Sequence, residues 1–151
     1  MPVPPQADDA VRIWFRFLRL STRIRFAVAE KLKTLGISVS QCDVLTTLTE
    51  AEGLSQQELA TRLYVTKGNI SGLVDRLAEA GLVERRATSA DRRSHAIFLT
   101  EEGRRIAAEG IAYQRAFVAR TFGQLPADQR LAFEATLIEV RNLVRKEMQS
   151  V

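Results

Sequence analysis

Cysteine and histidine are almost absent, because the chain of 151 residues has one of each, Cys42 and His95. A single cysteine forms no internal disulfide, and the two residues together supply too few ligands for a Cys/His zinc site. A hydrolase with a Ser-His-Asp triad would depend on His95, and the sequence has no Gly-x-Ser-x-Gly motif to accompany it. We therefore expect no enzyme activity, no cofactor and no bound metal ion.

Long apolar runs are also missing, since none exceeds four or five residues. A helix needs ~20 consecutive apolar residues to cross a bilayer, so we expect no membrane span. The segment Met1–Gln6 lacks the basic and apolar regions of a secretory signal, which favours the cytoplasm. Hydrophobic residues make up 46% and charged residues 26% of the chain, as is typical of a folded globular domain.

Lysine is scarce too: there are four lysines among the 22 basic residues, so the other eighteen are arginines. The formal net charge is +4. Guanidinium groups suit two-point contacts with carboxylate, phosphate or guanine, so an anionic partner is one explanation. A solvated surface or a coding bias would also account for this composition. The distribution of the arginines therefore matters more than their number.

Apolar residues at three- and four-residue spacing predict long helical regions at both ends, over residues 8–35 and 104–149. The first would be roughly 40 Å long, with an apolar arc too wide for one small domain to cover. We therefore predict that both regions are dimerisation helices in a symmetric dimer. Residues 1–7 are rich in proline and are expected to form a flexible N-terminal arm.

The central residues carry shorter elements. Ser40 and Gly53 are expected to bound one helix, the capping box at Ser55 starts a second, and Thr66 caps a third that ends before Gly81. Tyr64 lies where many such turns have glycine, so we expect a somewhat opened turn. Two strands, 82–86 and 96–99, are expected to flank a small, charged loop at 87–94. The predicted fold is mainly α (α+β): a domain over 8–151 with a winged helix-turn-helix at 38–100, its helix-turn-helix at 55–80 and its wing at 82–99.

The second helix of the predicted helix-turn-helix presents short polar and basic groups away from its apolar residues. The major groove of DNA admits one helix, and base edges pair with amide, hydroxyl and cationic groups. Asn69 suits adenine or helps to cap the helix. Gly68 and Gly72 allow close approach to another surface, or they are neutral surface residues. The candidate DNA-binding residues here are Ser55, Thr66, Lys67, Asn69, Ser71 and Arg76.

Residues 85–93 of the predicted wing concentrate positive charge, with Arg85, Arg86, Arg92 and Arg93 against a single acid, Asp91. Four guanidinium groups on a protruding ribbon suit a row of phosphates or a narrow minor groove. Asp91 is two residues from Arg93, where it could brace the loop and orient the arginine. A solvated loop is the plainer interpretation of these five residues. An alternative function is a docking module whose basic wing faces an acidic protein partner.

Five segments in combination resemble the MarR family of winged helix-turn-helix transcriptional regulators. They are Leu54–Ala60, Val65–Leu77, Gly81–Arg85, Asp91–Ser94 and Leu99–Gly103. The resemblance extends from about Asp9 to Met148. It implies a cytoplasmic, nucleoid-associated homodimer of bacteria or archaea, whose first, fifth and sixth helices interlace. Each subunit would place one recognition helix in the major groove and its wing in the adjacent minor groove.

The resemblance also assigns residues. Lys67, Asn69 and Ser71 fall in the recognition helix, and Asp91 and Arg93 match the Asp-x-Arg motif of the wing. The family often carries arginine or another long side chain near position 72, so Gly72 departs from its pattern of base contacts. The expected function is a sequence-specific regulator, a repressor, on a palindromic operator whose half-sites lie roughly 34–36 Å apart.

Many MarR-like proteins bind small aromatic or phenolic acids between the DNA-binding lobe and the dimer helices. The resemblance thus implies a small-molecule effector, such as an aromatic acid, that relieves repression. The candidate effector-binding residues are Trp14, Arg16, Phe17 and Tyr113. Aromatic residues at helical spacing fit plain core packing equally well.

Three further features have two interpretations each. Cys42 suits a small buried hydrophobic residue or a redox sensor, and His95 suits a strand residue near phosphate or a pH-sensitive site. Arginines at three- and four-residue spacing on the first helix suit a solvated edge, or a site for a carboxylate effector or an acidic partner. These are Arg12, Arg16, Arg19 and Arg23.

Overall fold

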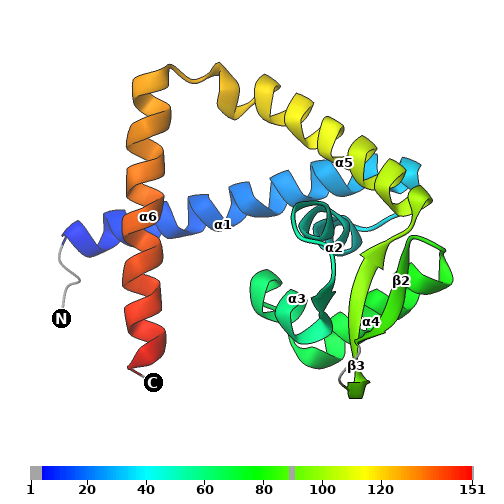
Figure 1. Ribbon diagram of the computed structural model, residues 1–151. Helices are drawn as coiled ribbons and strands as arrows, with labels where there is room; N and C mark the ends of the chain where they lie inside the picture. The colour runs from blue at the N-terminus through cyan, green and yellow to red at the C-terminus, as the bar shows by residue number, and fades with distance from the viewer. Residues whose placement is uncertain (1–4, 89–90, 151) are drawn as a thin grey trace. The chain divides into compact units, whose positions relative to one another are not determined.

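The computed structural model describes the backbone of residues 5–88 and 91–150, and the side chains of residues 8–88 and 95–150. The chain divides into two compact units, one up to Ile111 and one from Ala112 onward. The first unit holds the central helices and a small sheet, and Figure 1 shows these elements gathered around one end of the long helix α1. No helix in the described part of the chain combines the length and the apolar character that a membrane span requires.

Helix α1 (Pro5–Leu32) starts within the segment expected to be a flexible arm. Proline is tolerated in the first turn of a helix because its missing N–H would have no partner there, so residues 5–7 join the helix. A 3-10 turn, η1 (Lys33–Leu35), follows and ends at Gly36, whose φ of 75° is left-handed. Helix α2 (Val39–Glu50) begins after Ser38 rather than at Ser40, because Ser38 and Gln41 form a reciprocal capping box.

Helices α3 (Gln56–Leu63) and α4 (Lys67–Glu79) form the helix-turn-helix close to the bounds that the sequence predicts. Tyr64 joins them with φ 54° and ψ 44°, and its N–H bonds to the carbonyls of Ala60 and Thr61. The turn is therefore closed rather than opened as predicted. A tyrosine takes the left-handed conformation that glycine adopts more readily, and its side chain stays 89% exposed.

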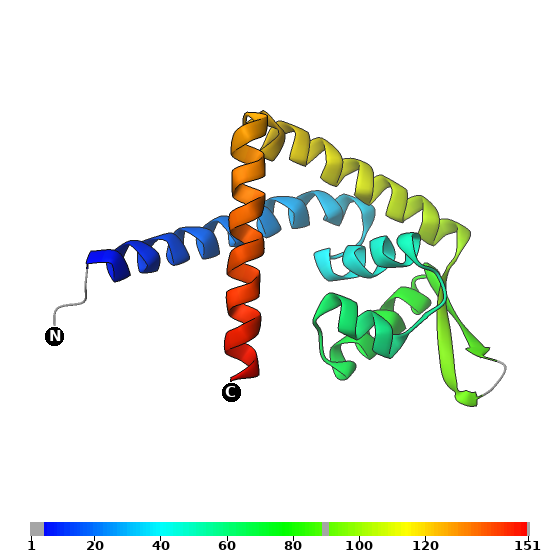
Figure 2. The same cartoon turned by 60° about the vertical axis from the view of Figure 1, so that its left-hand side comes forward.

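Strands β1 (Leu54–Ser55), β2 (Val83–Thr88) and β3 (Asp91–Leu99) form an antiparallel sheet in the order β1-β3-β2. The two-residue β1 is too short for a sequence period and is not predicted. The ribbon of β2 and β3, called the wing below, includes most of the expected loop 87–94, since Ala87 pairs with His95 and Thr88 with Asp91. Cross-strand pairing overrides the weak strand preference of these small and charged residues. In Figure 2 the wing projects away from α3 and α4.

The core of the first unit lies where the end of α1, helices α2 to α4, the sheet and the start of α5 (Glu101–Arg120) meet. Among the residues that the structure describes, every buried side chain is apolar or cysteine. Cys42 belongs to this core, as the plainer of its two interpretations predicts. The largest fully buried side chains are Leu32, Cys42, Val44, Leu45, Leu48, Leu59, Ile70, Val74, Leu77 and Ile97.

The start of α5 is fixed to the end of α4 by a tight junction, the α5 joint, made of Gly81, Leu82, Thr100 and Gly103. The Thr100 N–H donates to the Leu82 carbonyl at 3.1 Å, and the Thr100 hydroxyl donates to the Gly81 carbonyl at 2.6 Å. The same hydroxyl oxygen accepts from the Gly103 N–H at 3.0 Å. A Cβ on Gly103 would lie 1.9 Å from the Leu82 oxygen, so this close approach requires glycine.

The second unit consists of the end of α5, a 3-10 turn η2 (Phe122–Gln124) and helix α6 (Ala127–Gln149). The rings of Phe122 and Phe133 stack with centroids 6.1 Å apart. Within this unit, large hydrophobic side chains of α6 remain exposed, and the same holds for α1 in the first unit. Those of α6 are Leu131, Phe133, Leu137, Ile138, Val140, Leu143, Val144 and Met148.

Candidate nucleic-acid interface

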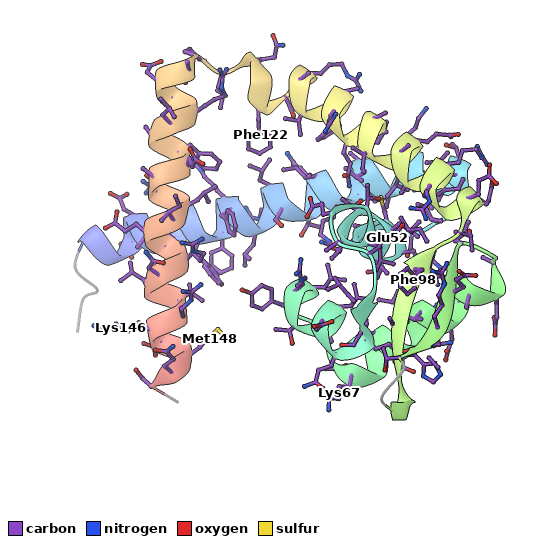
Figure 3. All side chains as sticks on the ribbon, in the orientation of Figure 1. Glu52, Lys67, Phe98, Phe122, Lys146 and Met148 are labelled. Carbon is purple, nitrogen blue, oxygen red and sulfur yellow. The ribbon has the colours of Figure 1, made fainter. Side chains whose placement is uncertain are left out.

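Helix α4 has one buried and one exposed face. Its buried face is fixed by Ile70, Leu73, Val74 and Leu77, which pack into the core of the first unit. The period of the helix then turns its polar residues outward. Lys67, Asn69 and Arg76 are exposed, and Ser71 is half-buried. Figure 3 shows Lys67 at the start of α4, directed away from α2.

The start of α4 is capped by Thr66, whose hydroxyl accepts a hydrogen bond from the Asn69 N–H at 3.2 Å. The backbone of Asn69 thus takes part in the cap, while its side chain is exposed. Ser55 caps α3 in the same way, in a capping box with Glu58. Helix N-termini carry partial positive charge and unpaired N–H groups, which attract phosphate.

The two glycines of α4 are not required by the packing of the protein itself. A Cβ on Gly68 would meet nothing within 4 Å, and one on Gly72 would lie 3.5 Å from the guanidinium group of Arg76. Arg76 therefore extends back along the exposed face of α4 toward Gly72. Nothing in the described part of the chain makes the close approach that these two glycines permit. The surface of α4 at Gly68 and Gly72 therefore has room for a binding partner.

Arg85 and Arg86 lie on opposite faces of the wing, because successive residues of a strand alternate. Arg85 shares the face of the buried Val83 and contacts two helices. Its Nε and Nη2 donate to Gln56 Oε1 at 3.1 and 3.0 Å, and its Nη2 also pairs with Asp75. The Arg85 side chain is only 29% exposed. Sequence reasoning predicted that Arg85 binds DNA and missed both of these internal partners.

Arg86 lies on the outward face of the wing, with a side chain that is 55% exposed. Its guanidinium group lies 4.1 Å from the centroid of the Phe98 ring, and its Nε donates to Glu84 at 2.7 Å. Phe98 in turn packs against Gly53, where an added Cβ would lie 3.2 Å from the ring. A cation–π contact of this kind orients the guanidinium group while leaving it open to solvent.

Asp91, Arg92 and Arg93 lie in β3, but their side chains lie outside the described residues. The predicted Asp91–Arg93 pair is therefore also outside them. His95 is exposed and pairs across the ribbon with Ala87.

The predicted effector-binding residues fall on both units. Trp14, Arg16 and Phe17 are exposed on α1. Residues two positions apart on a helix differ by about 200° around its axis, so Arg16 faces away from Trp14. Arg16 instead shares a stripe with Arg12, Arg19 and Arg23, all exposed. Tyr113 belongs to the second unit, where its ring lies 6.4 Å from that of Phe117.

Two side chains on α2 have altered acidity. Burial raises the pKa of the Cys42 thiol above its ordinary value, although the Thr46 hydroxyl, 3.9 Å from the sulfur, acts in the opposite direction. Burial likewise raises the pKa of Asp43, against the influence of Arg25. A buried thiol that keeps its proton is a poor nucleophile. No group of three or more His, Cys, Asp or Glu residues in the described part of the chain could hold a metal ion.

Known proteins resemble this chain in sequence and in fold. A model of the MarR family matches residues 35–94. The HTH-type transcriptional repressor Rv2887 of Mycobacterium tuberculosis is 33% identical over 131 residues, which span 87% of this chain and 94% of the relative. CouR from Rhodococcus jostii RHA1, solved with bound p-coumaroyl-CoA, is 33% identical, with a TM-score of 0.76 over 91% of this chain and 95% of CouR.

A third similarity concerns the fold alone. MepR of S. aureus, solved as a complex with DNA, has a TM-score of 0.79 at 21% identity, over 86% of this chain and 96% of MepR. These matches confirm the predicted fold, with its mainly helical architecture, small antiparallel wing and long terminal helices. They also agree with the expectation that the chain is not an enzyme. The chain belongs to the MarR family of DNA-binding transcriptional regulators.

Proposed function

We propose that the chain acts as a homodimeric repressor in the bacterial or archaeal cytoplasm and binds a palindromic DNA operator. The observation that carries this proposal is the exposed polar face of α4, with Lys67, Asn69 and Arg76 beside an arginine-bearing wing. The relative Rv2887 is named a repressor, which supports the same direction of control.

Two copies of the chain are needed for a palindromic site. Exposed hydrophobic side chains on α1 and on α6 support this assembly, because extended apolar surfaces on a single chain mark interaction sites. A two-fold dimer would present two recognition helices to successive major grooves. Sedimentation should therefore give twice the chain mass of 16.9 kDa. Replacing Leu143, an exposed leucine of α6, with glutamate should shift the protein toward monomer.

Base contacts are assigned to Lys67, Asn69, Ser71 and Arg76, which suit base edges and nearby phosphates. Ser55 and Thr66 lie at helix N-termini, where they suit phosphate oxygens. On the wing, Arg86, Arg92 and Arg93 are proposed to contact the backbone or the minor groove, with Asp91 orienting Arg93.

A small-molecule effector is proposed to release the operator. CouR binds p-coumaroyl-CoA, which supports an aromatic acid or its thioester as the class. Trp14 and Phe17, which lie three positions apart and share one side of α1, would contact the aromatic ring. Such an effector would favour a spacing of the two recognition helices that no longer fits successive grooves.

The effector is tested with p-coumaroyl-CoA, p-coumarate and coenzyme A as separate probes of operator release. Trp14→Ala should raise the concentration required by about tenfold, whereas Phe26→Ala, on another face of α1, should not. Equal effects of both variants would count against the assignment.

DNA binding is tested by selecting bound sequences from a random duplex library and measuring affinity over a salt series. We expect an inverted repeat, and a loss of roughly 10³–10⁵ in affinity between 50 and 200 mM salt if 6–10 phosphates are contacted. Arg93→Ala should weaken binding. If no duplex is bound even at low salt, the proposal fails, and docking of the basic wing onto an acidic protein becomes the better explanation.

A further inference from the structure

Arg85 connects three elements of the first unit, and the proposed function requires a fixed arrangement of the three. Gln56 is the first residue of α3, Asp75 lies near the middle of α4, and Arg85 itself lies on β2 (Figure 1). Arg85 donates to Gln56 Oε1 through Nε and Nη2, and Nη2 also pairs with Asp75. One side chain thus fixes the wing to both helices of the helix-turn-helix.

The geometry of this contact depends on a guanidinium group. Two donors of Arg85 meet the same Gln56 oxygen at 3.1 and 3.0 Å, and one of them also reaches a carboxylate. Arginine carries its donors in a rigid planar fork, whereas the lysine ammonium is a single point on a flexible stem. Lysine would keep the charge and lose the arrangement.

Arg85 lies near the start of β2, where the wing joins the rest of the first unit. It lies opposite Ile97 of β3, and Ile97 also pairs with Leu54 of β1. Ile97 is fully buried. Arg85 therefore lies on the edge strand β2, beside a buried residue of the central strand β3, rather than near the end of the wing.

Asp75 gives the pair an electrostatic role as well. It lies on the exposed side of α4, one turn after Ser71, and its side chain is 54% exposed. If α4 enters a groove, an unpaired carboxylate at this point would repel nearby phosphates. Arg85 offsets the negative charge of Asp75, and this ion pair engages the guanidinium group of Arg85.

We propose that Arg85 is a positioning residue that sets the orientation of the wing relative to the recognition helix, and thereby the sequence specificity of DNA binding. This inference rests on the proposed DNA-binding function. Non-specific affinity depends on the number of phosphate contacts, whereas specificity depends on a helix and a wing meeting their grooves together. Loss of the Arg85 contact should therefore reduce specific affinity more than non-specific affinity.

The first experiment compares Arg85→Gln with the matched variant Arg86→Gln, which removes the same charge from the outward face. Affinities for the selected operator and for a random duplex are measured over a salt series, below the unfolding temperature of each protein. Arg86→Gln should weaken binding to both duplexes. It should also reduce by about one the slope of log affinity against log salt concentration. Arg85→Gln should leave the slope unchanged and lower the ratio of specific to non-specific affinity by about tenfold.

The second experiment retains the charge of position 85 or removes that of its partner. Arg85→Lys and Asp75→Asn should each lower the specificity ratio, and their combination should lower it no further than the stronger single change, because both break one contact. Asp75→Asn should also strengthen random-duplex binding, since it frees a cation and removes an anion. Arg86→Lys keeps the charge of a proposed phosphate contact, so it should affect binding to both duplexes alike and leave the specificity ratio unchanged.

Amide hydrogen exchange of the protein without DNA separates this proposal from the proposed function. Arg85→Lys should speed exchange in β2 and in the middle of α4, whereas Arg86→Lys should not. If the unchanged protein binds no duplex, the proposed function fails and exchange alone decides whether Arg85 fixes the wing. If Arg85→Lys does not fold, Asp75→Asn provides the same measurements.

The positioning role is wrong if Arg85→Gln reduces the salt slope as Arg86→Gln does, because Arg85 would then be a phosphate contact. It is also wrong if the specificity ratio and the exchange rates of Arg85→Lys and Asp75→Asn equal those of the unchanged protein.

Discussion

Replacing Gly103 with alanine tests how tightly the α5 joint couples the recognition helix to the long helix α5. The added Cβ would lie 1.9 Å from the Leu82 oxygen and 2.9 Å from the Leu82 carbonyl carbon. Both are backbone atoms, so no side chain can rotate away. To reach even 3.0 Å from that oxygen, the start of α5 must move by about 1.1 Å.

The free-energy change of Gly103→Ala follows from what that movement breaks. Two hydrogen bonds of Thr100, to the carbonyls of Leu82 and Gly81, would be lost at ~1 kcal/mol each. Overpacking costs a further ~1–3 kcal/mol, and the helix propensity of alanine returns ~1 kcal/mol. The expected loss of stability is therefore about 2–4 kcal/mol, or roughly 4–16 °C in Tm for a chain of this size.

The assay is thermal and urea unfolding followed by circular dichroism, with Gly68→Ala as the control. Gly68 is also a helical glycine, but a Cβ there would meet nothing within 4 Å, so this change should stabilise the protein by ~0.5–1 kcal/mol. The two variants should therefore shift Tm in opposite directions. A Gly103→Ala protein that unfolds within 2 °C of the unchanged protein would refute the reasoning about the joint.

Three further predictions concern single side chains of the first unit. Tyr64→Gly should raise stability by about 1 kcal/mol in urea unfolding, because it relieves a left-handed backbone at an exposed position. Asp43→Asn should raise Tm at pH 7 but not at pH 3: burial raises the folded-state pKa, so the stability cost of ionising Asp43 develops as pH rises above the unfolded pKa and is absent below it. Cys42 should resist alkylation by iodoacetamide at pH 7 in the folded protein and react in urea, since burial keeps the thiol protonated and covered.

Elements with a strong local signal could be predicted from the sequence, while those fixed by distant partners could not. The caps at Ser55 and Thr66 place α3 and α4 correctly, because a cap is a bond between residues three positions apart. The start of α2 is misplaced by two residues, since Ser38 and Ser40 offer similar hydroxyls and only the pairing with Gln41 distinguishes them. Strand β1 exists only because Leu54 and Ser55 pair with β3, more than forty residues later.

The residues of the candidate interface are easier to predict from the sequence than the geometry of their contacts. Lys67, Asn69 and Arg76 were expected on the exposed face of α4, and the helical period is enough to put them there. The support of Arg86 by Phe98 was not foreseen, because it depends on which residue of β3 lies across from β2. A one-residue change of that register would place Phe98 on the other face of the ribbon.

The two consecutive arginines of β2 show what a closer reading of the sequence would have given and where it would have stopped. Val83 is apolar and begins the strand, so the two-residue period turns Arg85 toward the same inner face and Arg86 outward. That alternation already separates an arginine that must find internal partners from one that is open to DNA, because a guanidinium group on an inner face needs hydrogen-bond acceptors. The sequence does not identify those acceptors, since Asp75 and Gln56 lie 10 and 29 positions away on helices whose orientation only the packed structure defines. The arginines of a wing therefore have two different roles: some contact DNA, and others orient the wing. Variants such as Arg85→Gln and Arg86→Gln are needed to separate the two roles.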